Sequence, residues 1–336
     1  MKQILTLAAT AAVAALGTWL ASMRSGDTGA SAREPFAATA EAKTSQEEDL
    51  GPNARLTGVQ LFPPDNAWNA PIDHLPVDER SAAYIASIGA DAPLHPDFGR
   101  SSDGQSPGIP YVVVSGEQER RPVRFQYRDE SDVELYPIPD DAPIEGGPQS
   151  EGDRHLLVLD RGNLRLYELF GARKTGDVWT AGSGAIFDLR SNQLRPAGWT
   201  SADAAGLPIL PGLVRYDEAV AQAEIRHALR FTARMTRRAY VFPARHWASQ
   251  RTDENLPPMG LRVRLKASYE VSGFPPPAQV ILRALKKYGM LLADNGGNWF
   301  ITGAPDSRWN DEELATLKRI KGKDLEVVQT ENVVTP

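Results

Sequence analysis

Three carboxylates of this chain could carry acid–base chemistry, and all stand in or near one glycine-rich stretch. Glu168 lies inside an apolar run, whereas Asp188 and Asp203 lie within residues 179–211. A long irregular segment inside a folded domain is usually a functional or binding loop. Because a pair of carboxyl groups can serve as acid and base in glycosidic bond cleavage, these three residues are the candidate catalytic groups of a glycoside hydrolase.

Glu168 occupies the sequence Tyr-Glu-Leu-Phe, which is typical of a strand. Strand side chains alternate between faces, so Glu168 shares the face of Leu166, and Tyr167 takes the other face. If Leu166 faces a core, Glu168 must be paired, hydrogen-bonded or in a cleft. Such surroundings raise the pKa of a carboxyl and suit a general acid. The structural alternative is a salt bridge to Arg165 or to another Arg.

Structural explanations also exist for the other two carboxylates. Asp188 and Arg190 are two residues apart, so they would share a strand face and form an ion pair. Asp203 follows Ser201 and could cap a single turn with it. The functional interpretation makes Ser201 and Arg190 substrate-binding residues beside exposed carboxylates.

Trp199 is the candidate sugar platform of the same stretch. The apolar face of a sugar ring stacks on an indole while neighbouring carboxylates take hydroxyls or protons. The chain has 7 Trp, and most Trp in a β domain belong to the core.

A second group of residues could act on an anionic glycan. His227 or Tyr269 would abstract a proton, and Arg230 would neutralise the neighbouring uronate carboxylate. The fragment 265–269 resembles the Lys-x-x-x-Tyr strand of alginate-lyase-like jelly rolls, and 225–227 resembles their Gln-Ile-His strand with Arg in place of Gln. This resemblance implies a polysaccharide lyase. The alternative is a solvated sheet face with His227 packed in the core.

Metal and cofactor motifs are absent from the sequence. The 5 His show no short His–His spacing, and there is no Walker loop, GxGxxG, HExxH or GxSxG. The pairs His95 with Asp97 and Asp153 with His155 are better explained by turn hydrogen bonds than by metal ligation. We therefore expect no metal site and no cofactor, with Ca²⁺ in the acidic loops left open.

The N-terminal segment favours export. Residues 1–24 carry one early Lys, an apolar run and a closing Arg, as in a signal peptide, with an uncleaved membrane anchor as the alternative. Residues 25–57 indicate a flexible linker. With no Cys and a net charge of −6 without a basic block, the sequence excludes disulfides and disfavours nucleic acid as a partner. We expect a secreted or periplasmic monomer that meets a membrane only through an uncleaved N-terminal segment.

Residues 58–320 are expected to form a single β-rich domain, followed by a weakly ordered tail over 321–336. Helices are predicted over 79–88, over 278–290 and after a capping Asn310. Strands are predicted at 111–114, 123–127, 133–138, 155–160, 164–170, 179–188, 225–232, 239–243, 261–271 and 299–302. This order predicts a mainly β fold, an antiparallel sandwich, jelly roll or barrel, with two or three peripheral helices.

Several longer segments, among them GSGAIFDLRSNQLRPAGWTSADAAGLPILPG, resemble an uncharacterised family of secreted bacterial proteins. That resemblance implies export and one shared domain, and it supplies no catalytic residue. The sequence therefore predicts an exported carbohydrate-active enzyme, a glycoside hydrolase that acts on a polysaccharide or oligosaccharide. The alternatives are a polysaccharide lyase and a non-catalytic glycan-binding or envelope structural protein.

Overall fold

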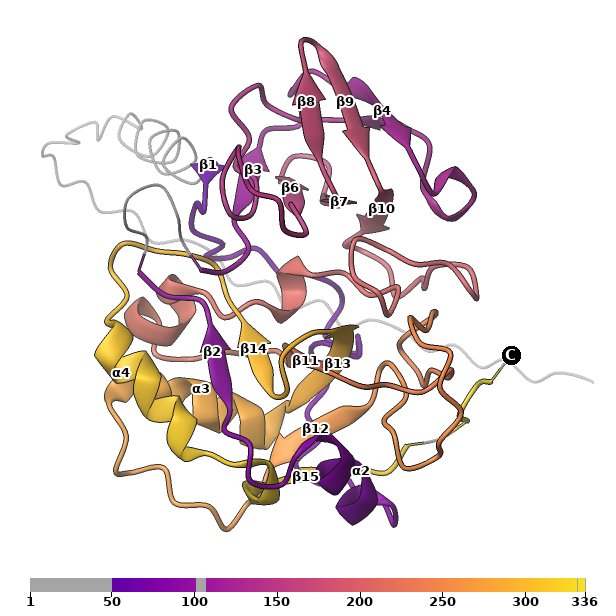
Figure 1. Ribbon diagram of the computed structural model, residues 1–336. Helices are drawn as coiled ribbons and strands as arrows, with labels where there is room; N and C mark the ends of the chain where they lie inside the picture. The colour runs from indigo at the N-terminus through magenta and orange to yellow at the C-terminus, as the bar shows by residue number, and fades with distance from the viewer. Residues whose placement is uncertain (1–49, 101–106, 331, 336) are drawn as a thin grey trace, which may run out of the picture. The chain divides into compact units, whose positions relative to one another are not determined.

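Three mixed β-sheets and three α-helices build the part of the chain described by the computed structural model, residues 50–100, 107–330 and 332–335 (Figure 1). The predicted mainly β fold with few helices is confirmed. Each sheet contains at least one parallel pair, namely β3 with β6, β11 with β13, β14 with β2, and β4 with β9.

The strands fall into sheets of five, six and four. The first has the order β1 (Gly51–Pro52), β3 (Tyr111–Val114), β6 (Leu156–Asp160), β7 (Arg165–Phe170) and β10 (Ser183–Asp188). The second has the order β15 (Leu325–Val327), β12 (Arg262–Leu265), β13 (Met290–Asn295), β11 (Leu229–Ala233), β14 (Phe300–Thr302) and β2 (His95–Asp97). The third has the order β5 (Leu135–Tyr136), β4 (Arg121–Phe125), β9 (Val178–Ala181) and β8 (Arg173–Thr175).

The helices are α2 (Ser81–Ile88), α3 (Pro276–Lys287) and α4 (Asp311–Ala315), close to their predicted positions. Asn310 caps α4 by accepting hydrogen bonds from the backbone N–H groups of Glu312 and Glu313. The Gly89 that follows α2 has a φ of 127°, a conformation that favours glycine. Shorter 3₁₀ segments include η2 (Leu210–Gly212), and residues 217–221 form a π-helix, η3.

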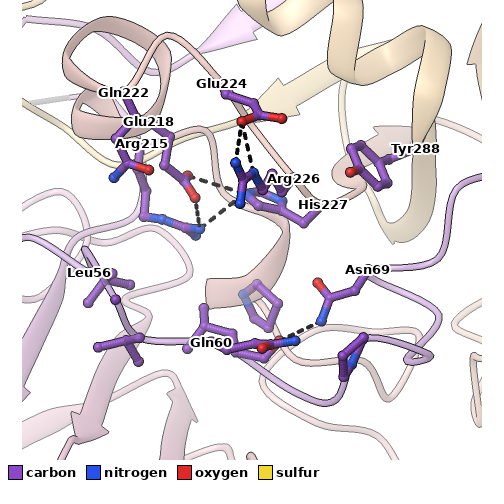
Figure 2. Close-up of a pocket in the computed structure, with 15 residues that line it drawn as sticks. Leu56, Gln60, Asn69, Arg215, Glu218, Gln222, Glu224, Arg226, His227 and Tyr288 are labelled. Atoms are coloured by element: carbon purple, nitrogen blue, oxygen red, sulfur yellow. Dashed lines mark hydrogen bonds and ion pairs between the residues drawn. The ribbon is translucent and has the colours of Figure 1, made fainter.

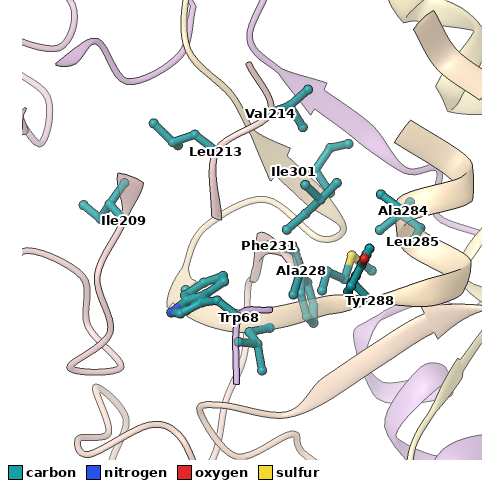
Figure 3. Packing of buried hydrophobic residues seen from close by; sticks show 14 of the residues in the cluster. Trp68, Ile209, Leu213, Val214, Ala228, Phe231, Ala284, Leu285, Tyr288 and Ile301 are labelled. Carbon is teal, nitrogen blue, oxygen red and sulfur yellow. The ribbon is translucent and has the colours of Figure 1, made fainter. Parts of the chain in front are cut away.

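Two separate apolar cores lie on opposite faces of the five-stranded sheet. Leu166 belongs to the larger core, and Tyr167 and Leu169 belong to the smaller one, as the strand alternation predicted. The larger core also contains Phe231 and Ile301 from the six-stranded sheet (Figure 3). The alternation therefore turns Glu168 toward the larger core, where it meets the segment that leads into η2.

Two predicted boundaries were wrong. Part of the linker predicted over 25–57 belongs to the fold, because β1 pairs with β3 and Ala54 and Leu56 are buried. The tail predicted from 321 contains η5 (Gly322–Asp324) and β15, whose Leu325 and Val327 are buried. The signal peptide or anchor predicted over 1–24 lies outside the described residues. No helix of the described part is long and apolar enough to cross a membrane.

Candidate functional site

One face of the six-stranded sheet is polar where β2, β14, β11 and β13 lie side by side (Figure 1). The core residue Phe231 pairs with Ile301, so their neighbours Thr232 and Phe300, which also pair, face the other way. Pairing of β14 with β2 places His95 opposite Phe300, and the two rings stack with centroids 4.0 Å apart.

A β-bulge brings Asp294 to this polar face. In the parallel pair, Phe231 is opposite Leu292 but Thr232 is opposite Asp294, so Ala293 is the extra residue. Strict alternation would have turned Asp294 toward the core with Leu292. The backbone N–H of Ala205 donates to the Ala293 carbonyl at 2.9 Å, which ties the segment after Asp203 to the bulge.

Asp203 and Arg230 form a buried bidentate ion pair. Arg230 Nη2 lies 2.7 Å from Asp203 Oδ1, and Arg230 Nε donates to Oδ2 at 2.9 Å. The remaining Nη1 donates to the hydroxyl of Thr302 on β14. Both charged side chains are buried, so each is held in place by the other. Asp203 therefore neither caps a turn nor lies exposed, as the two sequence-based alternatives required.

Asp294 shares a side-chain hydrogen bond with Asp203. Burial, and then the negative charge of Asp203, raise the pKa of Asp294 to about 8. Since a hydrogen bond between two carboxyl groups needs one proton, the raised pKa of Asp294 makes Asp294 the donor of this bond at neutral pH. Asp294 is half-buried, whereas Asp203 is fully buried, so the proton lies on the more accessible partner.

His155 is a buried cation beside this pair. Its Nδ1 lies 2.6 Å from Glu145 Oε2, and its Nε2 lies 3.0 Å from the carbonyl oxygen of Ala202. Both partners are acceptors, so both ring nitrogens donate and the ring is an imidazolium. Burial opposes this charge, but the hydrogen bond and charge of Glu145 outweigh it and raise the pKa of His155 to about 9.

Glu145 is held in its ionised form by the same contact. Burial raises its pKa, but the hydrogen bond and the charge of His155 outweigh that effect, so the pKa falls below its ordinary value. The side chain is 26% exposed.

Asp97 lies at the end of β2. The residue as a whole is exposed, but its carboxyl group is partly desolvated, which raises its pKa. The positive charge of Arg230 acts to lower the pKa of Asp97 and of Glu145, so both carboxyl groups lie within the electrostatic influence of Arg230.

Glu168 anchors a segment and forms no ion pair with any Arg in the described part of the chain. Its carboxylate accepts hydrogen bonds from the backbone N–H of Ile209 at 2.8 Å and of Leu210 at 2.9 Å. Burial raises the pKa of Glu168 to about 7, against the opposing effect of these two bonds. The suggested partner Arg165 instead pairs with Glu134 on the surface. We call Glu145, Glu168, Asp203 and Asp294, together with His155 and Arg230, the carboxylate cluster.

Asp188 and Arg190, expected as site residues, form an exposed ion pair with each other at 2.9 Å. Ser201 is buried and shapes the segment, because its hydroxyl accepts from the Asp203 N–H and donates to the Leu207 carbonyl. Trp199 is half-buried, with the Arg195 guanidinium 5.6 Å from its ring centroid. The structure therefore brings Glu168, Asp203 and Arg230 together and leaves these four residues outside the cluster.

His227 and Tyr269 are not joined by any contact among the described residues. The strand predicted over 261–271 ends at Leu265, so Tyr269 lies in the loop beyond β12. Arg262 and Arg264 on β12 are largely buried and donate to backbone carbonyls, so this strand presents no row of free cations to an anionic glycan. The ring nitrogens of His227 are occupied by the Ala228 carbonyl and by the side chains of Arg215 and Glu218.

The sequence prediction missed Asp294 and Glu145 and weighed His155 and Asp97 only as metal ligands. The available signal for Asp294 was a carboxylate that closes the apolar run Met-Leu-Leu-Ala, as Glu168 interrupts another. Among the residues that the structure describes, no group of three or more His, Asp or Glu side chains is arranged to hold a metal ion. No protein-family model, curated protein or solved structure matches this chain.

Proposed function

We propose that this protein is a carbohydrate-active hydrolase that cleaves a glycosidic bond with the carboxyl groups of the carboxylate cluster. The observation that carries the proposal is the hydrogen-bonded pair of Asp294 and Asp203 beside Arg230. It supports a general acid that is protonated at neutral pH and only partly exposed. Carboxyl groups whose surroundings separate their pKa values are the usual arrangement for acid–base catalysis.

In this mechanism Asp294 protonates the leaving glycosidic oxygen. Asp203 accepts the Asp294 hydrogen bond and is held in place by Arg230, so neither Asp203 nor Arg230 needs to touch substrate. Glu145, ionised and partly exposed, is the candidate for the second carboxylate, which activates water or attacks the sugar. His155 orients Glu145 and keeps it charged.

A saccharide substrate is also supported by the surroundings of the carboxyl groups. The stacked rings of His95 and Phe300 are half-buried on the same sheet face, and such rings provide the apolar contact that sugar rings use. The proposed export of the protein fits a polysaccharide substrate outside the cell.

The proposal is tested with the purified full chain on a panel of neutral and acidic polysaccharides, by measuring new reducing ends. Asp294→Asn and Glu145→Gln should each lower the rate by about 100-fold or more, the usual contribution of a general acid or base. The matched controls are Asp177→Asn and Glu151→Gln, two exposed carboxylates away from the cluster, which should keep the wild-type rate.

Unsaturated uronate products would instead indicate a lyase. Saturable glycan binding without new reducing ends would indicate a binding protein. Full activity of both Asp294→Asn and Glu145→Gln would refute the assigned roles.

A further inference from the structure

A second site lies on the other side of η2 from Glu168. The pocket has a volume of about 470 Å³, within the ~300–1,000 Å³ of typical small-molecule sites. It contains no member of the carboxylate cluster. The polar side chains that line it are Gln60, Asn69, Arg215, Glu218, Gln222, Glu224, Arg226, His227 and Tyr288 (Figure 2).

The charges of this pocket are neutralised within its own wall. Arg215 pairs with Glu218 at 2.7 Å, and Arg226 pairs with Glu224 at 2.7 Å. Burial opposes ionisation of Glu218, but the neighbouring Arg215 guanidinium and the hydrogen bonds from the Arg215 and His227 side chains outweigh it and lower its pKa to about 2. The wall therefore offers a ligand no uncompensated cation and no uncompensated carboxylate.

Uncharged hydrogen-bonding groups remain available around the same space. The Asn69 side-chain amide donates hydrogen bonds to the carbonyls of residues 61–63, so its Oδ1 remains available as an acceptor. Within the described part of the chain, the Gln60 amide and the Tyr288 hydroxyl have no hydrogen-bond partner, and each can donate and accept. Figure 2 shows Gln60 and Asn69 across the pocket from the group formed by Arg215 and Glu218.

The pocket also has apolar lining. Leu56, Val59, Leu61 and Pro211 contribute to its wall, and the ring of Tyr288 belongs to the apolar core beside it. A ligand must therefore present hydroxyl groups toward the amides and a carbon face toward these side chains. Simple ions cannot use the apolar wall, and a purely apolar ligand would leave the amides unpaired.

We propose that this pocket binds a neutral saccharide unit of one or two rings, at a site separate from the carboxylate cluster. Because the charged side chains of the pocket wall pair with each other, the pocket should not prefer uronates or amino sugars. Its uncharged donors and acceptors fit the hydroxyl groups of a sugar. The site acts by binding alone, since both nitrogens of His227 are already engaged. The inference goes beyond the proposed hydrolase activity and does not depend on it.

The test is a titration of the full chain, followed by saturation-transfer-difference NMR and calorimetry. The probes are glucose, galactose, mannose, N-acetylglucosamine, cellobiose and maltose, with galacturonate and glucosamine as charged comparisons. At least one neutral probe should bind saturably and more tightly than either charged sugar. Tyr288→Phe and Gln60→Ala should each weaken binding about fivefold or more, as expected for one lost hydrogen bond.

The matched controls are Tyr127→Phe and Gln329→Ala, which change an exposed Tyr and an exposed Gln outside the pocket and should leave affinity unchanged. Asp294→Asn should bind the same probe with wild-type affinity, which separates this site from the proposed catalytic one. The inference is overturned if no neutral probe saturates. It is equally overturned if galacturonate binds more tightly than galactose, or if both pocket variants bind as the wild type does.

Discussion

At the scale of single residues, the raised pKa values of His155 and Asp294 depend on their neighbours. Glu145 keeps His155 charged against burial, and the charge of Asp203 adds to burial in keeping Asp294 protonated. Such groups lie in a medium of low effective dielectric, so each depends strongly on its partner. Changing one partner should therefore move the proton equilibrium of the other.

The charge of His155 tests this dependence. Glu145→Gln keeps an oxygen near Nδ1 but removes the negative charge, so burial should prevail and the pKa of His155 should fall from about 9 to below its ordinary value. The measurement is an NMR titration of ¹⁵N-labelled histidine rings. Glu151→Gln serves as the control and should leave the titration unchanged. An unaltered pKa in Glu145→Gln would contradict the assigned pairing.

Removing one partner of the buried ion pair between Asp203 and Arg230 should strongly lower the free energy of unfolding. Asp203→Asn leaves the buried Arg230 without its counter-charge, and such a loss costs about 3–5 kcal/mol. Denaturant unfolding followed by fluorescence measures the change. Asp188→Asn removes one partner of the exposed pair with Arg190 and should give no measurable change. Equal effects of the two substitutions would show that the buried pair is not structurally important.

At the scale of elements, the segment around η2 separates the carboxylate cluster from the saccharide pocket. The Leu210 N–H donates to Glu168 at 2.9 Å, while the Leu210 carbonyl accepts from Arg215 Nη1 at 2.8 Å. One residue thus contacts both sites through its backbone. The close approach of this segment to its surroundings depends on Gly212, which packs between Trp68 and Arg230.

Gly212→Ala should therefore disturb both sites. An added Cβ would lie 2.6 Å from a ring atom of Trp68 and 2.9 Å from Arg230 Cβ, and overpacking of this kind costs about 1–3 kcal/mol. Thermal unfolding and hydrolysis rates measure the effect. The control is Gly152→Ala, where the nearest atom would be Ser150 Oγ at 3.5 Å and no loss is expected. A fully stable and active Gly212→Ala protein would contradict this packing argument.

Sequence patterns predicted the elements that depend on local information. The hairpin of β6 and β7 follows from two apolar runs around Arg-Gly-Asn, and period-2 alternation identified the face of Glu168. Helix α3 follows from its apolar stripe and preceding prolines. These signals lie within a few residues of one another, so one sequence suffices to recognise them.

Long-range and irregular features were not predictable in the same way. The position of Asp294 depends on one bulged residue, Ala293, and strand alternation alone turns it to the wrong face. The pair of Asp203 and Arg230 joins a loop to a strand 27 positions away, and no local pattern marks that contact. Alternation also suggested that the strand at 261–271 continues past Leu265, where the chain instead turns.

At the scale of the whole molecule, the buried groups predict how stability varies with pH. Glu168, Asp294 and His155 have pKa values of about 7, 8 and 9, each above its value in the unfolded chain. Their contribution is present at low pH and is lost as pH rises through these values. Glu218, with a pKa of about 2, has a lowered value, so its contribution is present above about pH 4.3 and is lost on acidification.

The expected result is a maximum in Tm near about pH 4, with a steady fall toward about pH 9 as Glu168, Asp294 and then His155 lose their protons. Scanning calorimetry across this range checks it, and Asp294→Asn should lose less stability than the wild type between about pH 4 and 8 because its amide does not ionise. A Tm that rises from pH 6 to 9.5 would contradict the assigned directions of the pKa shifts.

The order of strands in the six-stranded sheet bears on when the protein can fold. One edge is β2, which ends at Asp97, and the other is β15, which begins at Leu325. Strands β2 and β15 are far apart in sequence, and both must join before the sheet is complete. Contacts between residues so distant in sequence form slowly. During synthesis, the ribosome releases β2 long before β15 exists, so the sheet under Asp294 and Arg230 remains unfinished until residue 327 has emerged. The nascent chain consequently presents unpaired strands to chaperones, and Asp294 can join Asp203 and Arg230 only after β13 has emerged.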